Sequence, residues 1–418
     1  MTPTILVIGT HDTKAPELAY LADRIRAAGG RPLHMDVSVL GDPPEPVEIG
    51  KAEVAAAGGR RIEDAMGAED ENAAMQIMAA GAAALTRRLH AEGRIDGVIA
   101  LGGSMGTDLA LDVAAALPIG VPKVMVSTVS FSPMIPPERL APDIQMILWA
   151  GGLYGLNDIC RAALSQAAGA VVGAARTAER PAAARPMIGM TSFGKTVLRY
   201  MVPLKPALES RGFDVAVFHA TGMGGRAFEG LAAAGAFAAV MDFAPQEVGN
   251  HMMGSSITAG PDRMTAAGRA GVPQIVAPGC YDLADFAGSF PLPDALAGRP
   301  VHAHNRLISS VLLDEGERRA LARLFCARMA EARGPVAFIL PARGCNEWDR
   351  PGAPLHDAAG LAAFCDEMRR ACPAGVDLIE IDAHINDPAF ADAALAVLDR
   401  WVAEGQLSGS SRERSSRS

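Results

Sequence analysis

Short apolar runs of strand length alternate along the chain with longer stretches in which apolar residues recur every three or four positions. The run Thr4–Gly9 is followed by a helical pattern over 15–28, and the run over 97–101 by one over 108–117. A continuous apolar run is typical of a strand buried on both faces, and strands that alternate with helices favour parallel pairing. The pattern therefore predicts an α/β protein with mainly parallel sheets.

The alternation is interrupted near residues 177–186, where a helical run gives way to a segment rich in proline and alanine. The run Met187–Ser192 then restarts the pattern seen at the N-terminus, because it also ends in a small polar turn. We therefore expect two α/β domains, residues 1–178 and 184–405, that face each other across a cleft. The polar, low-complexity tail over 406–418 is expected to be disordered.

A modest internal repeat favours two related domains, and the alternative is a similar strand pattern that arose independently in each. The segment 119–128 is echoed by 270–279, since each combines a helix end, a Val-Pro pair and a buried strand. A long helix over 71–92 is expected to contribute apolar residues to the core or to dimer packing. In the second domain the stretch 305–332 is amphipathic throughout.

A glycine-rich turn joins the run over 97–101 to the helix that follows it. Gly102, Gly103 and Gly106 let a backbone come close to a ligand, and the first N–H groups of a helix have no partner within it. Such a turn presents N–H donors and a partial positive charge to an anion, most often a phosphate. Ser104 and Thr107 add hydroxyl groups. A tight connection that binds nothing is the alternative interpretation.

Two further polar turns follow apolar runs, and ligands of open α/β sheets lie outside the carboxyl ends of the strands. One follows the first strand and includes a lysine suited to phosphate. The other is a pair of hydroxyl residues after the run over 124–126. The candidate ligands in these turns are Gly9, Thr10, Asp12, Thr13 and Lys14, and then Ser127 and Thr128.

Residues 189–196 satisfy the pattern GxxxxGK[ST] of a phosphate-binding P-loop, with Lys195 and Thr196 in its last two positions. The interior of this segment contains no glycine, and Pro203 and Pro206 occur early in the following helix. A true P-loop, another anion-facing turn and a purely structural connection all remain open at this point.

Composition narrows the classes of function. The chain has 418 residues, of which 50% are hydrophobic and 20% charged, and its net charge is −9. An acidic protein without a basic block is a poor partner for nucleic acid. Its apolar runs are shorter than the roughly 20 residues of a membrane span, and the N-terminus lacks the pattern of a signal peptide. Six cysteines without zinc or disulfide spacing favour a reduced, cytoplasmic protein.

Taken together, several unusual segments resemble the ATP-binding family related to the tomato mosaic virus resistance protein, whose members are mostly bacterial. The segments span nearly the whole chain in order and include 9–18 (GTHDTKAPEL), 101–107 (LGGSMGT), 126–130 (VSTVS), 218–229 (FHATGMGGRAFE), 268–283 (GRAGVPQIVAPGCYDL), 302–305 (HAHN) and 385–393 (INDPAFADA). The resemblance implies two Rossmann-like, three-layer domains, a homodimer, and ATP held by the N-terminal domain. It assigns ATP to the turns at 9–14, 102–107 and 127–128.

In the second domain, His219 ends a predicted strand and precedes Thr221 in a glycine-rich turn that opens a helix. A histidine in this position is a candidate general acid or base, or simply a residue that caps the turn. With Asn305, these residues form the candidate set for binding and converting a substrate.

Other histidines and cysteines have weaker functional interpretations. The spacing of His302 and His304 fits a metal site, although no third ligand is evident. Cys280 is a candidate nucleophile, but a buried thiol is the more common role of such a residue. Asp382 and His384 either face the cleft or cap the helix that begins near residue 388.

Two functions follow from these features. The first is an enzyme, a ligase or phosphotransferase, that uses ATP and Mg²⁺ to convert a small polar or anionic metabolite in the interdomain cleft. The second is a nucleotide-sensing or protein-interaction module in which ATP stabilises the fold without turnover.

Overall fold

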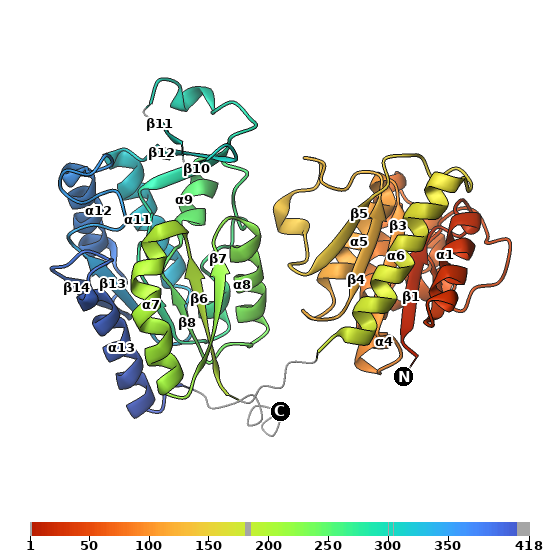
Figure 1. Ribbon diagram of the computed structural model, residues 1–418, viewed down its shortest axis with the longest axis horizontal. Coiled ribbons are helices and arrows are strands. Elements are labelled where there is room, and N and C mark those ends of the chain that lie inside the picture. The colour runs from red at the N-terminus through yellow and green to blue at the C-terminus, as the bar shows by residue number, and fades with distance from the viewer. Residues whose placement is uncertain (1, 180–184, 300, 304, 408–418) are drawn as a thin grey trace. The chain divides into compact units, whose positions relative to one another are not determined.

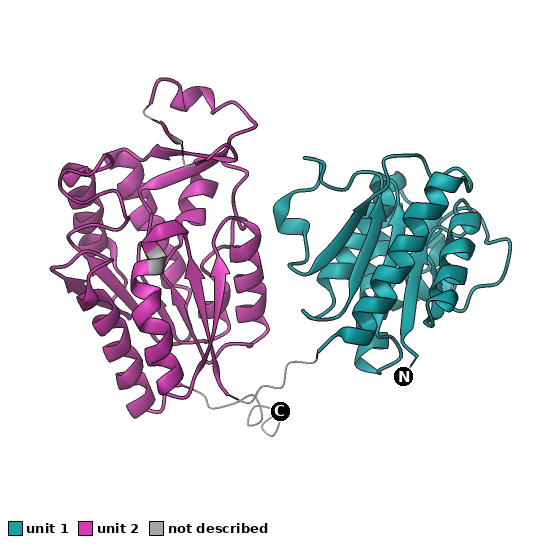
Figure 2. Cartoon of the chain, in the orientation of Figure 1, with its two compact units in different colours: residues 1–181 teal, residues 182–418 magenta. Residues whose placement is uncertain are grey.

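The computed structural model describes residues 2–179, 185–299, 301–303 and 305–407 (Figure 1). The chain divides into two compact units, residues 1–181 and 182–418 (Figure 2). Each unit contains a parallel sheet with helices on both faces, so the predicted α/β class is confirmed. Part of the expected linker (180–184) and most of the expected tail (408–418) lie outside the described residues.

The first unit has a five-stranded parallel sheet in the order β2-β1-β3-β4-β5. Its elements are β1 Thr4–Gly9, α1 Ala15–Ala27, β2 Arg31–Asp36, α2 Lys51–Ala57, α3 Ile62–Met66, α4 Glu71–Ala91, β3 Gly97–Gly102, α5 Ser104–Ala115, β4 Lys123–Ser127, η1 Pro137–Arg139, β5 Ile144–Leu148 and α6 Asp158–Thr177.

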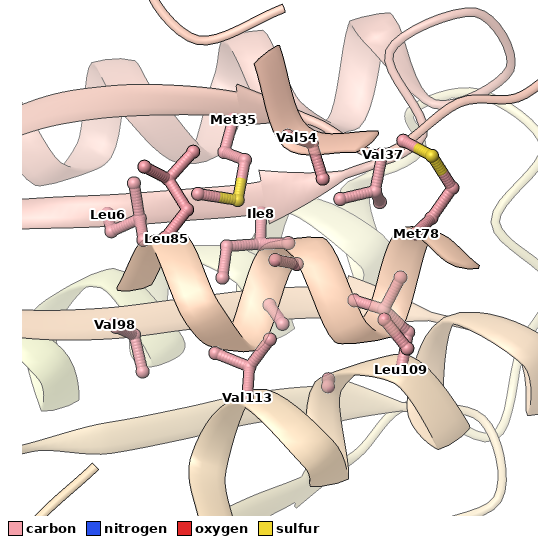
Figure 3. Close-up of a cluster of buried hydrophobic side chains, with 14 of the residues drawn as sticks. Leu6, Ile8, Met35, Val37, Val54, Met78, Leu85, Val98, Leu109 and Val113 are labelled. Carbon is pink, nitrogen blue, oxygen red and sulfur yellow. The ribbon is translucent and has the colours of Figure 1, made fainter. Parts of the chain in front are cut away.

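Alternate residues of β1 contact different helices, as the period of a strand requires. Leu6 and Ile8 pack in one cluster with side chains of α4 and α5 (Figure 3). Ile5 and Val7 pack in another cluster with side chains of α1 and α6. Because both faces are covered, the sequence of β1 is apolar throughout, which is why it could be recognised without the structure.

The second unit has a six-stranded parallel sheet in the order β14-β13-β9-β8-β6-β7 and a three-stranded antiparallel sheet in the order β10-β12-β11. Its elements are β6 Met187–Ser192, α7 Gly194–Ser210, β7 Asp214–His219, α8 Met223–Ala233, β8 Ala239–Asp242, α9 Gln246–Met252, α10 Ala266–Arg269, β9 Gln274–Val276, β10 Leu283–Ala287, η2 Asp294–Leu296, β11 Val301–Ala303, β12 Ile308–Leu312, α11 Glu315–Met329, β13 Val336–Pro341, α12 Ala358–Ala371, β14 Val376–Ile381 and α13 Pro388–Ala403.

The core of this unit is also divided by its sheet. Ala337 and Ile339 of β13 pack with α7 and α13. Phe338 and Leu340 pack on the other face with α11 and α12. The antiparallel sheet adds Phe286 and Val311 to this second cluster.

One local expectation differs from the structure, and one helix contains two prolines. The amphipathic stretch over 305–332 is divided between strand β12 and helix α11, because Asp314 and Glu317 form a capping box that starts the helix there. Helix α7 continues through Pro203 and Pro206, both of which have exposed side chains. The opposite face of α7 buries Tyr200, Leu204 and Leu208 in the core, which holds the helix together despite its prolines.

Candidate nucleotide site

The order of the first sheet places a topological switch point between β1 and β3. From β1 the chain continues to β2, which lies on one side of β1 in the sheet. It then crosses to β3 on the other side of β1, and β4 and β5 continue in that direction. Ligands of open α/β sheets bind in the crevice outside the carboxyl ends of the strands at such a point. In the register Ile8 pairs with Ala100 and Gly102 with Ser127, so the three predicted turns follow adjacent strand ends. The structure therefore brings the sequence-predicted ligands to one edge of the sheet.

The N-terminus of α5 lies at this switch point and has no side-chain cap. Gly103 is the N-cap residue in an extended conformation, with no side-chain hydrogen bond, and the first turn contains no acidic residue. The first bond within the helix runs from the Thr107 N–H to the Gly103 carbonyl, 2.9 Å. The N–H groups of the preceding helical residues thus have no partner within the helix, which is the arrangement that binds anions.

Space for a ligand exists beside Gly103. A Cβ atom built on Gly103 would have only the Thr128 hydroxyl nearby, at 3.9 Å. Ser104 is exposed and Thr128 half-buried next to this space. Gly103, Ser104 and Thr128 thus have the environment expected of phosphate ligands.

The hydroxyl groups of Thr107 and Ser127 have a different role from the one predicted. Both residues are buried, and their oxygens lie 2.6 Å apart in a hydrogen bond. The Ser127 hydroxyl also accepts the N–H of Val129, 3.0 Å. These two side chains tie α5 to β4.

The turn after β1 combines a packing glycine with polar groups. A Cβ atom on Gly9 would lie 2.8 Å from the Leu18 side chain, so this glycine is needed for the approach of α1. The hydroxyls of Thr10 and Thr13 share a hydrogen bond of 2.9 Å. Asp12 accepts the N–H of Gly41 with Oδ2, 3.2 Å, whereas its buried Oδ1 has no partner among the described residues.

Lys14 joins this turn to a loop that sequence reasoning missed, residues 149–157 after β5. The Lys14 Nζ donates to the Leu153 carbonyl, 2.6 Å, and lies 4.8 Å from the ring centre of Tyr154. The Gly155 N–H donates to the buried carboxylate of Glu17, 2.8 Å. The sequence contains a signal for this loop, because three glycines (151, 152 and 155) follow an apolar run and indicate a turn at the end of a further strand.

In the second unit, His219 is the last residue of β7 and Thr221 follows in the β7–α8 turn. The His219 ring lies edge-on to Phe193, 5.9 Å between centres. Gly222, the N-cap residue of α8, has a φ of 93°, a conformation that favours glycine. Its N–H donates to the buried carboxylate of Glu247.

That carboxylate belongs to a buried ionic cluster, which we call the Arg263 cluster: Glu229, Asp242, Glu247 and Arg263. The Arg263 guanidinium donates to Glu247 at 2.7 Å, to Glu229 at 3.1 Å and to Asp242 at 2.8 Å. Burial raises the pKa of Glu229 and Glu247 above the usual range, although Arg263 acts in the opposite direction. The cluster fixes the turn that carries His219 and Thr221.

Asn305 has a structural role that the sequence did not indicate. Its side-chain oxygen accepts the N–H groups of Leu307, 2.7 Å, and Ile308, 3.0 Å. These bonds close the turn between β11 and β12, so the oxygen is already engaged within its own segment. His304 lies outside the described residues, and elsewhere in the described chain no three His, Cys, Asp or Glu side chains are grouped to hold a metal.

The P-loop interpretation of residues 189–196 is wrong. Residues 189–192 are part of β6 and pair with β7 and β8, so a single residue, Phe193, separates the strand from α7. A phosphate-cradling loop needs several residues there. Thr196 is buried, and its hydroxyl accepts the N–H of Glu347, 3.0 Å, and the thiol of Cys280, 3.3 Å.

The remaining candidates are held in structural contacts. Burial raises the pKa of the Cys280 thiol well above its usual value, which disfavours the thiolate that a nucleophile needs. The buried His384 ring contacts Asp349 at 2.7 Å through Nε2 and accepts the Asn386 N–H at 3.0 Å through Nδ1. Asp382 pairs with Arg343 at 2.5 Å on the surface.

No helix in the described part of the chain is both long and apolar enough to cross a membrane. Residues 3–180 match the N-terminal domain, and residues 185–402 the C-terminal domain, of the uncharacterised protein family UPF0261.

Relatives share most of the chain. A UPF0261 protein of Brucella melitensis is 57% identical over 404 residues, which cover 97% of each chain. One from Clostridium tetani is 34% identical over 395 residues, which cover 94% of this chain and 97% of the relative. The ToMV resistance protein Tm-1 of Solanum lycopersicum is 27% identical over 421 residues, covering 94% of this chain and 55% of that protein.

Solved structures are more distant. The Streptomyces glycosyltransferase SsfS6 complexed with thymidine diphosphate aligns with 66% of this chain and 81% of its own, at 17% identity and a TM-score of 0.21. The S. aureus MnaA–UDP structure aligns with 66% of this chain and 79% of its own, at 9% identity and a TM-score of 0.22.

Proposed function

This chain belongs to the UPF0261 protein family, as its motifs predicted, and we propose that its first unit binds the phosphates of ATP between β1 and β3. The observation that carries the proposal is the uncapped N-terminus of α5 at the switch point, with open space beside Gly103. Free N–H groups and a partial positive charge are the features that an anionic phosphate recognises.

The residues at this edge fit a triphosphate with its magnesium ion. The N–H groups at the start of α5 and the hydroxyls of Ser104 and Thr128 are donors for phosphate oxygens. Lys14 supplies a compact cation on the neighbouring turn. The unpartnered Oδ1 of Asp12 is an oxygen of the kind that Mg²⁺ prefers.

We further propose that the second unit holds a small polar or anionic substrate at the β7–α8 turn. Helix α8 has no acidic residue of its own in its first turn, and its N-cap residue Gly222 donates its N–H to the buried Glu247 carboxylate, so the turn is held open for a polar group beside it. ATP supplies a transferable phosphoryl or adenylyl group, so the reaction is a ligation or a phosphoryl transfer. In this scheme His219 and Thr221 orient the substrate, and the Arg263 cluster keeps their turn in place.

Calorimetric titration with ATP, with and without Mg²⁺, tests the first step. We expect saturable binding that tightens with Mg²⁺, and undetectable binding at millimolar ATP contradicts the proposal. ATP consumption is then followed while fractions of a small-metabolite extract are added. Consumption that depends on one fraction supports an enzyme.

A module that binds ATP without turnover is the second candidate, and it is favoured by the tomato relative, which is named a ToMV resistance protein. Partner capture from a lysate, with and without ATP, tests it. Proteins retained only in the presence of ATP support this function, and an identical set in both conditions argues against it.

A further inference from the structure

An open pocket of about 470 Å³ lies against α1, β2 and the turn after β1. Its volume is in the range of small-molecule sites. Small or apolar side chains form much of its wall, namely Ala15, Ala19 and Ala22 of α1, and Pro44, Pro46 and Val47 of the segment before α2. The three alanines lie on one face of the helix, where larger side chains would fill the space.

Two imidazole rings provide the pocket with polar groups. His11 comes from the β1–α1 turn and His34 from β2, and their ring centres lie 5.1 Å apart in an edge-to-face contact. His11 is only 6% exposed. Its Nε2, like the Nδ1 of His34, is buried and has no hydrogen-bond partner among the described residues. Buried polar atoms are seldom left unpaired in native proteins, so these two atoms point to a ligand.

Both rings are neutral at pH 7. Burial, helped by His34, lowers the pKa of His11 to about 4, and burial also lowers the pKa of His34. A neutral imidazole offers one N–H donor and one lone pair. Three charged residues line the pocket: Asp23 and Arg26, which pair with each other at 2.9 Å on the exposed side of α1, and the exposed Glu45.

We propose that this pocket binds the adenine base of the nucleotide whose phosphates lie at the N-terminus of α5. A planar, uncharged ring with nitrogen donors and acceptors along its edge matches apolar walls and two neutral imidazoles. His11 lies within the turn that also contains Thr10, Asp12 and Lys14, so the pocket begins where the proposed phosphate site ends.

The strand spacing agrees with this arrangement. The pocket borders β2 and the phosphate site borders β3, and β1 lies between them. The two sites are therefore about two strand spacings apart, roughly 10 Å. A nucleotide lying across the end of β1 joins them. This inference rests on the proposed function, because it extends the same ligand into a second subsite.

Separate probes for the two ends of the nucleotide test the inference on the full-length protein. Adenosine reports the base pocket, inorganic triphosphate reports the phosphate site, and ATP with Mg²⁺ reports both. Ala19→Phe fills the pocket from an exposed helical position, and Ala80→Phe, at an exposed position of α4, is the matched control. His34→Phe keeps a ring of similar shape but removes its nitrogen atoms.

We expect Ala19→Phe to weaken binding of adenosine and of ATP at least tenfold and to leave triphosphate binding unchanged. His34→Phe is expected to weaken adenosine binding severalfold, and Ala80→Phe to change none of the three. Unfolding midpoints within a few degrees of the wild type show that the variants are folded.

The outcomes separate this inference from the proposed function. ATP that binds equally to the wild type and Ala19→Phe overturns the base pocket while the phosphate site stands. A second outcome has two parts: the wild type binds adenosine and Ala19→Phe does not, while the wild type does not bind triphosphate and binds ATP no more tightly than adenosine. This result supports the base pocket and overturns the phosphate site. A wild-type protein that does not bind adenosine at millimolar concentration overturns the inference.

Discussion

Gly102 and Gly103 are adjacent in the chain and have opposite reasons to be glycine. A Cβ atom on Gly102 would lie 2.7 Å from the Cα of Gly106, so Gly102 allows the first turn of α5 to pack against the end of β3. Gly103 has open space beside it and an ordinary φ of −75°. A larger residue at position 103 is therefore compatible with folding. The small size of glycine matters there only for a ligand that comes close to the backbone.

Gly103→Val is expected to abolish ATP binding and to leave the fold intact, because the new side chain occupies the space proposed for phosphate. Gly50→Val is the matched control, since Gly50 is also an extended N-cap residue with open space around its Cβ position. Calorimetric titration and thermal unfolding of both variants test this expectation. Equal ATP affinity in Gly103→Val and the wild type contradicts the proposed site.

Lys14→Ala is expected to weaken ATP binding by about 1–3 kcal/mol, the range for a lost hydrogen bond to a charged group. Lys195→Ala should change little, because residue 195 belongs to the second unit and its segment is not a P-loop. Dissociation constants of the two variants, measured by the same titration, test both expectations. A strong effect of Lys195→Ala together with retained binding in Gly103→Val moves the phosphate site to the second unit.

His11 makes the stability of the first unit depend on pH. Its pKa is lowered from 6.5 to about 4 by burial and by His34, whereas Asp36, Glu48 and Asp12 act in the opposite direction. Between these two pH values the unfolded chain binds a proton that the folded chain does not. The free energy of unfolding therefore falls as the pH is lowered from about 6.5 to about 4, by at most about 3 kcal/mol from this group.

His11→Phe is expected to lose less stability than the wild type over this range, because the variant has no proton to bind at this position. Urea unfolding at pH 7.5, 5.5 and 4.5 measures the difference, with His251→Phe, an exposed position, as the control. Parallel pH profiles for His11→Phe and the wild type show that the ring is not buried in its neutral form.

At the scale of elements, the Arg263 cluster joins α8, β8 and α9 beneath the β7–α8 turn. One guanidinium faces three carboxylates, and all four residues are less than 5% exposed. Removing one partner of a buried ionic group leaves the other charges without compensation, which destabilises a protein far more than the loss of a surface pair.

Arg263→Met is expected to destabilise the second unit by about 3–5 kcal/mol. Arg269→Met, which removes an exposed pair with Glu331, is expected to cost at most about 1 kcal/mol. Chemical denaturation followed by tryptophan fluorescence compares the two variants. Two of the three tryptophans, Trp348 and Trp401, lie in the second unit and report its unfolding. Similar losses in the two variants are incompatible with a cluster that holds its turn in place.

At the scale of the whole molecule, the two units have related sheets. Numbered from its own first strand, the first sheet has the order 2-1-3-4-5 and the second the order 2-1-3-4-5-6. The sequence echo between 119–128 and 270–279 falls on corresponding fourth strands, β4 and β9. Each unit also has hydrophobic clusters of its own.

Because the proposed nucleotide ligands all lie in the first unit, residues 1–181 produced alone are expected to bind ATP with the affinity of the full chain. Residues 182–418 produced alone are expected not to bind it. Titration of both fragments, after circular dichroism has shown that each is folded, measures this division. ATP binding by the second fragment alone contradicts the assignment.

Many of the strands and the turns that follow them could be predicted from the order of residues alone. Thr4–Gly9 and Met187–Ser192 are strands with the predicted bounds, since a strand covered on both faces is apolar throughout and its end is marked by a turn. Once the sheets are parallel, the turns at Gly9, Gly102 and Ser127 must share an edge.

The roles of individual side chains depend on the fold, because their partners are distant in the chain. Thr107 and Ser127 are 20 residues apart and bond to each other. The glycine spacing of residues 189–196 matches a P-loop, yet pairing with β7 and β8 makes its first half a strand. The pocket of His11 and His34 exists because β1 and β2 are neighbours in the sheet. The periodicity of apolar residues predicts which face of a strand is buried, but it does not predict which residues of other elements contact that face.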